Sequence, residues 1–172
     1  MLLLSINIYM VNIVTVIVDT GIIFAFYSLG DKYHYDSLGL IAHLIEGKWG
    51  KPFITNHILD ESLNILKYRI GWRTAEAFLE TFIDSNLLQI IYTDSDLEHD
   101  SINIFRRNID RRGLSYTDVV TITCINIFKI NFLISYDIRS FKGFVKNIIG
   151  PHYWETLSRE ERQRILDIVR KI

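Results

Sequence analysis

The run IVTVIV at residues 13–18 restricts the fold of this 172-residue chain more than any other segment. It contains only Ile, Val and Thr, has the length of a strand, and offers apolar or β-branched side chains to both faces. A strand buried on both faces is typical of a parallel sheet that helices cover on each side. The run therefore predicts an α/β fold with this strand near the centre of the sheet.

Segments with strand and helix patterns alternate along the rest of the chain. Further strands are predicted at residues 52–55, 87–92, 131–136 and 144–148, and helices at residues 20–28, 32–46, 57–70, 72–85, 93–112 and 115–128. The acidic residues that open the 93–112 segment are typical of a helix start. This alternation predicts a three-layer α/β/α fold around a central parallel sheet of four to five strands.

The length and composition fit one domain with a short extension. Hydrophobic residues make up 49% and charged residues 23% of the chain, which is enough apolar surface for a folded core. We expect the domain at residues 10–148 and a C-terminal helical extension at residues 149–172. Ser158 and Glu161 have the spacing of a capping box at the start of a helix in that extension.

The apolar N-terminus raises the question of a signal peptide or membrane anchor. Residues 1–18 lack a basic segment and a small-residue cleavage site, and polar residues interrupt the run. The pattern favours a short extension before the first strand, with Met1 or Met10 as the start, and no membrane segment. Cys124 is the only cysteine, which excludes an internal disulfide and a cysteine-rich zinc site. We therefore expect a cytoplasmic protein.

Acidic side chains follow two of the predicted strands. Asp19 comes directly after the first strand, and Asp137 directly after the strand that ends at Tyr136. The carboxyl ends of parallel strands share one edge of a sheet, where ligands bind in open α/β folds. Glu61 lies at the border of the apolar arc of its helix, where we expect its carboxylate to be half-buried. These three acids are therefore candidates for one site.

Asp118 stands on the first turn of a helix that carries no other charged residue through Phe128. An almost uniformly apolar helix is buried, so this carboxylate needs a cap, a cation or a metal to compensate its burial. Ser115 already occupies the predicted N-cap position, which favours a metal over a cap. Four converging carboxylates would repel one another unless Mg²⁺ or Mn²⁺ neutralised them. Such an ion can activate water for phosphodiester hydrolysis.

The segments around these acids resemble the PIN-domain family, and specifically its VapC-type toxin ribonucleases. They are VDTGIIFAF with Asp19, TNHILDESLNIL with Glu61, LSYTDVVTI with Asp118 and ISYDIRSF with Asp137, and the resemblance extends over about residues 13–144. It implies that the four acids are ligands of Mg²⁺ or Mn²⁺ and that Ser115 is an orienting hydroxyl. It also implies cleavage of single-stranded RNA, or of structured RNA such as tRNA, together with homodimerisation and inhibition by a small antitoxin protein.

Basic residues suited to RNA phosphates occur near two of the acids. The formal net charge of −1 gives no global sign of nucleic-acid binding, so any basic surface must be local. Four residues that flank the acids are candidates for RNA binding: Arg111, Arg112, Arg139 and Lys142. Arg111 and Arg112 belong to a cluster that fits better a solvated helix face paired with Asp110 and neighbouring acids. Arg139 and Lys142 are nearer to Asp137 in the sequence and are therefore the better candidates.

A second function fits the same residues. A PIN-like module that binds RNA or protein without cutting is the alternative to a nuclease. Such a module has no need of mutually repelling carboxylates, which favours the metal-dependent endoribonuclease. Loss of divalent-metal binding in a folded protein would favour the binding module.

Overall fold

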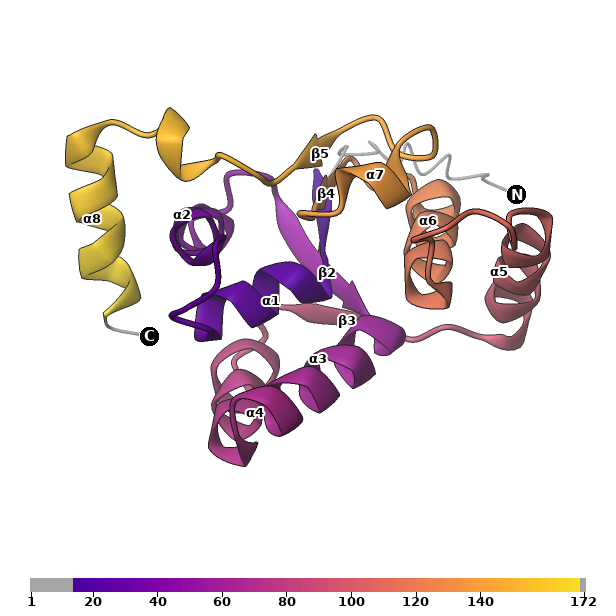
Figure 1. The fold of residues 1–172 in the computed structure, drawn as a ribbon, viewed down its shortest axis with the longest axis horizontal. Coiled ribbons are helices and arrows are strands. Elements are labelled where there is room, and N and C mark those ends of the chain that lie inside the picture. The colour runs from indigo at the N-terminus through magenta and orange to yellow at the C-terminus, as the bar shows by residue number, and fades with distance from the viewer. Residues whose placement is uncertain (1–13, 171–172) are drawn as a thin grey trace, which may run out of the picture.

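The computed structural model describes residues 14–170 and has a wholly parallel, five-stranded sheet between two layers of helices (Figure 1). The strand order is β3-β2-β1-β4-β5. The strands are β1 (Thr15–Val18), β2 (Lys51–Thr55), β3 (Gln89–Ile91), β4 (Phe132–Ile134) and β5 (Ile148–Ile149). The predicted α/β/α fold with its central parallel sheet is confirmed.

β1 lies at the centre of the sheet, as its composition predicts. Val16, Ile17 and Val18 are completely buried, because helices pack on both faces of this strand. β1 pairs with β2 on one side and with β4 on the other, so that Ile17 stands opposite Phe53 and Leu133. The residues that follow β1 and β4 therefore lie next to each other at the carboxyl edge of the sheet.

Two groups of helices cover the sheet on opposite faces (Figure 1). Between β1 and β3 the chain forms α1 (Thr20–Tyr27), α2 (His34–Ile45), α3 (Asn56–Arg69) and α4 (Trp72–Phe78). Between β3 and β5 it forms α5 (Ser95–Arg107), α6 (Tyr116–Phe128) and the short α7 (Ile138–Phe141). Right-handed crossovers that run in opposite directions across the sheet place the two groups on opposite sides. Within residues 14–170, no helix is long and apolar enough to cross a membrane.

The helix predicted at residues 93–112 is too long. α5 ends at Arg107, because Asn108 leaves the helical conformation and its side-chain amide donates to the carbonyl oxygen of Ile104 at 2.9 Å. The residues that follow form the loop to α6 instead of a further helical turn. This loop carries Arg111. The irregular backbone of the loop places the Arg111 side chain for the contacts described below.

The last predicted strand starts too early. The backbone N–H groups of Phe144 and Val145 donate to the carbonyl oxygen of Phe141, which makes this segment the turn that ends α7. β5 therefore begins only at Ile148. The helix predicted at residues 72–85 also changes character, since α4 continues as a π-helical turn over Leu79–Asp84.

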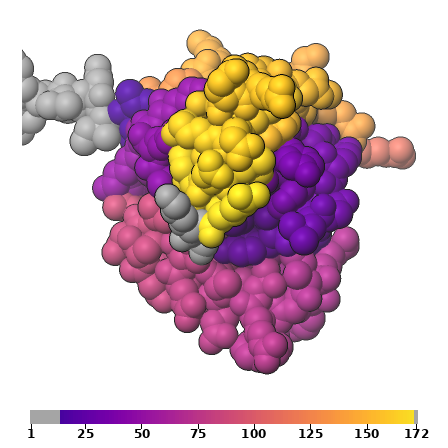
Figure 2. Space-filling view, turned by 90° about the vertical axis from the view of Figure 1, so that its left-hand side faces the viewer, coloured from indigo at the N-terminus to yellow at the C-terminus, as the bar shows by residue number. Residues whose placement is uncertain are grey.

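The C-terminal extension contains the predicted helix, α8 (Arg159–Val169). Ser158 is its N-cap, and its Oγ accepts a hydrogen bond from the backbone of Glu161 at 3.2 Å. The segment before α8 is held by Asp36 of α2, whose carboxylate accepts from the backbone N–H groups of His152 and Trp154 at 3.0 and 2.7 Å. Figure 2 shows this extension lying across the helical surface of the domain.

Candidate active site

Asp19 occupies the point where β1 ends and α1 begins. It is the N-cap of α1, and its Oδ1 accepts a hydrogen bond from the backbone N–H of Thr20 at 2.8 Å. Its Oδ2 accepts from the hydroxyl of Ser135, which directly follows β4, at 2.6 Å. The predicted position of Asp19 at the carboxyl edge of the sheet is confirmed. One of its oxygens is thus oriented by the start of α1 and the other by the residue after β4.

The environment of Asp19 disfavours a negative charge. The pKa of this carboxyl is raised to about 7, chiefly by burial and also by the nearby carboxylates of Asp118 and Glu61, while the hydrogen bond from Ser135 lowers it. None of the ion pairs formed within residues 14–170 includes any of the four candidate acids. A divalent cation would reverse this penalty, because it favours the ionised form of every carboxylate around it.

Glu61 reaches the same edge from α3, but it is not half-buried as the sequence predicts. Its side chain is exposed, since the buried stripe of α3 consists of Ile58, Ser62 and Leu66. The helix is thus rotated slightly away from the apolar arc that its sequence suggests. The hydroxyl of Thr20 donates to Glu61 Oε2 at 3.0 Å and directs the carboxylate toward the start of α1.

Asp118 and Ser115 form a complete capping box at the start of α6. Ser115 Oγ accepts from the backbone N–H of Asp118 at 3.1 Å, and Asp118 Oδ2 accepts from the backbone N–H of Ser115 at 2.7 Å. The expectation that Ser115 as N-cap leaves Asp118 without a capping role is therefore wrong. Burial raises the pKa of Asp118, and the carboxylates of Asp137 and Glu61 raise it further.

Asp137 follows β4 and is the N-cap of α7, a helix that the sequence does not predict. Its Oδ1 accepts from the backbone N–H of Ser140 at 3.0 Å, and its Oδ2 accepts from the Ser140 hydroxyl at 2.5 Å. The Asp137 side chain is exposed. Its own backbone N–H donates to Ser135 Oγ at 3.0 Å, so one serine contacts both Asp19 and Asp137.

The structure gathers the four acids at one edge without closing them into a ligand cage. The carboxylates of Asp118 and Glu61 raise the pKa of Asp19, and those of Asp137 and Glu61 raise the pKa of Asp118. Within residues 14–170, no three Asp, Glu, His or Cys side chains converge as ligands of a single ion. Mg²⁺ is commonly held by one or two carboxylates and keeps several waters. The donor set therefore fits a hydrated hard cation better than a fully protein-ligated one.

Three of the four acids lie at helix N-termini. Asp19 and Asp137 are N-caps, and Asp118 stands at the third position of its helix. The partial positive charge of a helix N-terminus favours a carboxylate there. These ends partly offset the mutual repulsion of the acids, which lets them share an edge before any cation binds.

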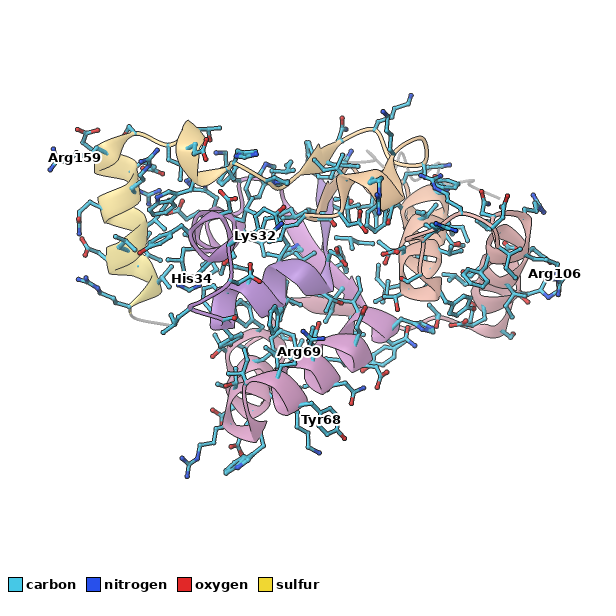
Figure 3. All side chains as sticks on the ribbon, viewed as in Figure 1. Lys32, His34, Tyr68, Arg69, Arg106 and Arg159 are labelled. Atoms are coloured by element: carbon cyan, nitrogen blue, oxygen red, sulfur yellow. The ribbon has the colours of Figure 1, made fainter. Side chains whose placement is uncertain are left out.

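The four predicted RNA-binding residues differ in their surroundings. Arg111 Nη2 donates to the carbonyl oxygens of Arg139, Ser140 and Lys142 at 3.1, 3.0 and 2.8 Å, so this side chain braces α7 and the turn after it. Arg112, Arg139 and Lys142 have exposed side chains. Arg106, which is not one of these four residues, extends outward from α5 on the side away from α6 (Figure 3).

Sequence reasoning missed the hydroxyl residues that orient the acids. Thr20, Ser135 and Ser140 hold Glu61, Asp19 and Asp137 through the hydrogen bonds described above. Two of them carry a signal in the sequence, since Thr20 directly follows an acid and Ser140 stands three residues after an N-cap aspartate. The contact of Ser135 with Asp19 joins residues 116 apart in the chain and has no local signal.

Comparison with known proteins gives a family match over these acids. The PIN-domain model matches residues 16–145. A VapC ribonuclease of Archaeoglobus fulgidus is 44% identical over 155 residues, which cover 90% of this chain and 95% of that protein. The crystal structure of Mycobacterium tuberculosis VapC20, titled a sarcin-ricin loop cleaving toxin, has a TM-score of 0.64 and 25% identity over 76% of this chain and 96% of that chain. The Pyrobaculum aerophilum protein PAE2754 shares the fold, with a TM-score of 0.53 and 20% identity over 90% and 96% of the two chains.

Proposed function

The chain belongs to the PIN-domain family, and from that membership we propose that it is a metal-dependent endoribonuclease of the VapC toxin type. The proposed substrate is single-stranded RNA, including the loops of structured RNA such as tRNA. Two relatives support this class by their names, one as a VapC ribonuclease and the other as a toxin that cleaves the sarcin-ricin loop. Single-stranded loops expose the phosphodiester backbone that such an enzyme must reach.

The observation that carries the proposal is a set of four carboxylates at one sheet edge with no ion-pair partner within residues 14–170. Burial, together with the carboxylates of Asp118 and Glu61, raises the pKa of Asp19 to about 7. A module that only binds RNA gains nothing from repelling acids that also repel phosphates. A hard divalent cation explains the arrangement, because it converts the repulsion into ligand binding.

The roles of the residues follow from their hydrogen bonds. Four acids would hold a hydrated Mg²⁺ or Mn²⁺, either directly or through its bound waters: Asp19, Glu61, Asp118 and Asp137. When bound, the ion supplies Lewis acidity toward a phosphoryl oxygen and lowers the pKa of a bound water. Thr20 and Ser135 orient two of these carboxylates from α1 and the end of β4. Ser115 acts on Asp118 through the capping box and so fixes the first turn of α6.

RNA contacts are assigned to the exposed basic residues beside Asp137. Arg139 and Lys142 follow this acid closely in the sequence, and Arg112 lies in the loop that Arg111 ties to α7. Guanidinium and ammonium groups bind phosphate oxygens without reading sequence. The proposal also includes a homodimer, a small antitoxin that blocks the acidic site, and a cytoplasmic place of action where RNA is the substrate.

The test is cleavage of an end-labelled single-stranded RNA with Mn²⁺, with Mg²⁺ and with EDTA. We expect cleavage with either metal, none with EDTA, and a loss of at least about a hundredfold in Asp118→Asn, which removes a charge from the transition-state environment. An asparagine Oδ1 can still accept from the Ser115 backbone, so the capping box and the fold should persist. Asp60→Asn, at an exposed position on α3, is the matched control.

Either of two results would contradict the proposal. Cleavage that survives EDTA would exclude a metal-dependent mechanism at these acids. A folded protein, checked by circular dichroism, that binds the RNA without cutting it under any metal condition would support the binding module instead.

A further inference from the structure

A second polar cluster lies beside the four acids and has no part in the function described so far. Its centre is Glu98 of α5, whose side chain is about 29% exposed. Glu98 Oε1 accepts hydrogen bonds from His57 Nε2 at 2.6 Å and from the Thr93 hydroxyl at 2.5 Å, and Oε2 accepts from the Tyr116 hydroxyl at 2.5 Å. We call these four residues the Glu98 cluster. A single carboxylate thus joins α3, the loop before α5, and α6.

Two of the three partners of Glu98, His57 and Tyr116, stand close to candidate metal ligands in the chain. His57 is on the first turn of α3, one helical turn before Glu61 and on the same face of that helix. Tyr116 is the first residue of α6, two positions before Asp118. Glu98 therefore links the N-terminal turns of two helices that lie on opposite faces of the sheet, and each of these turns leads into an acid.

The hydrogen bonds of the cluster keep the Glu98 carboxylate ionised. Although burial raises it, the pKa of Glu98 falls to about 2 because Thr93, Tyr116 and His57 all hydrogen-bond to the carboxylate. Burial and the same carboxylate raise the pKa of Tyr116 to about 12, so its hydroxyl stays a donor. Hydrogen bonds to an ionised acceptor are shorter and stronger than neutral ones. The ring of His57 also packs edge-on against Tyr116, with centroids 5.5 Å apart.

Other contacts also hold α5, α6 and the start of α3. α5 and α6 are joined separately by the buried side chain of Leu97 and by a hydrogen bond of 3.0 Å between the hydroxyls of Ser101 and Thr123. The start of α3 is separately capped by Thr55, whose Oγ1 accepts from the backbone N–H of Ile58 at 3.1 Å. The hydrogen bonds of Glu98 add to these contacts, and they join the starts of α3 and α6 through one side chain.

We propose that Glu98 is a positioning residue, which fixes the N-terminal turns of α3 and α6 relative to each other and so sets the spacing of the Glu61 and Asp118 carboxylates. The meaning of that spacing for metal binding rests on the proposed function. The placement of the two helices by Glu98 does not rest on the proposed function, and it can be measured without metal or RNA.

The decisive variant is Glu98→Gln, which keeps the shape of the side chain and replaces one acceptor oxygen with a donor. The amide cannot accept from all three partners, so at least one of the three hydrogen bonds is lost or reversed and none is made to a charged acceptor. Tyr116→Phe removes the link to α6 alone and keeps the ring. Ser101→Ala is the matched control, because it removes a buried hydrogen bond between α5 and α6 that does not involve α3.

The first measurement is Mn²⁺ affinity by electron paramagnetic resonance of the free ion, with no RNA present. We expect Glu98→Gln to weaken Mn²⁺ binding about tenfold, in the range seen when residues that orient ligands are altered. Tyr116→Phe should act in the same direction with a smaller effect, and Ser101→Ala should bind as the wild type does. In cleavage assays, Glu98→Gln should raise the half-saturating Mn²⁺ concentration by the same factor and leave kcat at saturating Mn²⁺ nearly unchanged.

The second measurement is the distance distribution between spin labels at Asn64→Cys on α3 and Asn126→Cys on α6. Both sites are exposed, and the buried Cys124 has a thiol pKa raised to about 12 by burial, so it should not react with the label. We expect Glu98→Gln to broaden this distribution and Ser101→Ala to leave it narrow. A broadened distribution in a protein whose wild type neither binds Mn²⁺ nor cuts RNA would refute the proposed function and keep the positioning role. An unchanged distribution with wild-type Mn²⁺ affinity would refute the positioning role.

Discussion

Removing the charge of Asp19 should stabilise the metal-free protein at neutral and alkaline pH. The pKa of this carboxyl is raised from its ordinary value of 3.8 to about 7, chiefly by burial and then by Asp118 and Glu61. A group with a raised folded pKa binds more protons in the folded than in the unfolded chain between these two values. The free energy of unfolding therefore falls as the pH rises from about 4 to about 7, and it stays reduced above that range. Asp19→Asn abolishes this loss.

The size of the effect follows from the shift. The rise in pKa corresponds to a penalty of up to about 4 kcal/mol on the folded, ionised protein, at about 1.4 kcal/mol for each tenfold change. Asp19 keeps some contact with solvent, which screens part of the penalty. Asparagine also has one acceptor oxygen for the two donors, Thr20 and Ser135, at a cost of about 1 kcal/mol. The expected net gain at pH 8 is about 2 kcal/mol.

Urea unfolding in EDTA at pH 8 and pH 5 measures this gain, with Asp60→Asn as the control at an exposed carboxylate on α3. At pH 5 the advantage of Asp19→Asn should fall to less than half. Saturating Mg²⁺ should stabilise the wild type and not the variant, since ligand binding to the folded state raises its stability. A variant that is less stable than the wild type at pH 8 would refute the reasoning about buried charge. So would a variant whose free energy of unfolding differs from that of the wild type by the same amount at both pH values.

Three other changes test parts of the structure. Arg111→Met should lower the free energy of unfolding by about 2 kcal/mol, because three carbonyl oxygens lose a charged donor, whereas Arg112→Met at an exposed site should change urea stability by less than about 0.5 kcal/mol. Asp36→Asn should speed limited proteolysis within residues 150–170. The backbone N–H groups of His152 and Trp154 each donate to a different oxygen of Asp36, and asparagine has only one oxygen for both. Thr20→Val, nearly isosteric, should reduce metal-dependent RNA cleavage about tenfold through a misdirected Glu61, with circular dichroism unchanged.

The sequence predicts those features that depend on a strongly patterned strand. The run at residues 13–18 identifies the central strand, and the acids at the ends of β1 and β4 follow from the geometry of parallel sheets. Asp19 and Asp137 were therefore predictable as neighbours before any coordinates. Asp118 was predictable as an anomaly, since it is the only charge on α6.

Other features depend on contacts that no local pattern records. The packing of α3 buries Ser62 and leaves Glu61 exposed, where its carboxylate accepts a hydrogen bond from the Thr20 hydroxyl of α1. The loop after α5 is irregular because Arg111 must reach the carbonyl groups of α7, 28 to 31 residues further along the chain. Neither contact can be inferred from the periodicity of the segment that makes it.

Three of the four acids both cap a helix and carry a charge of the site, and this determines which substitutions separate the two roles. Asp19, Asp118 and Asp137 each accept a backbone N–H at the start of a helix, so an alanine at any of them removes a cap worth about 1 kcal/mol along with the charge. Asparagine keeps an acceptor and isolates the charge. Loss of activity in an asparagine variant with an intact helix therefore reports on the cation, whereas the same loss in an alanine variant confounds the cation with the fold. Glu61 caps no helix, so alanine at this position removes no cap and differs from glutamine only by the hydrogen bond from Thr20 and the length of the side chain.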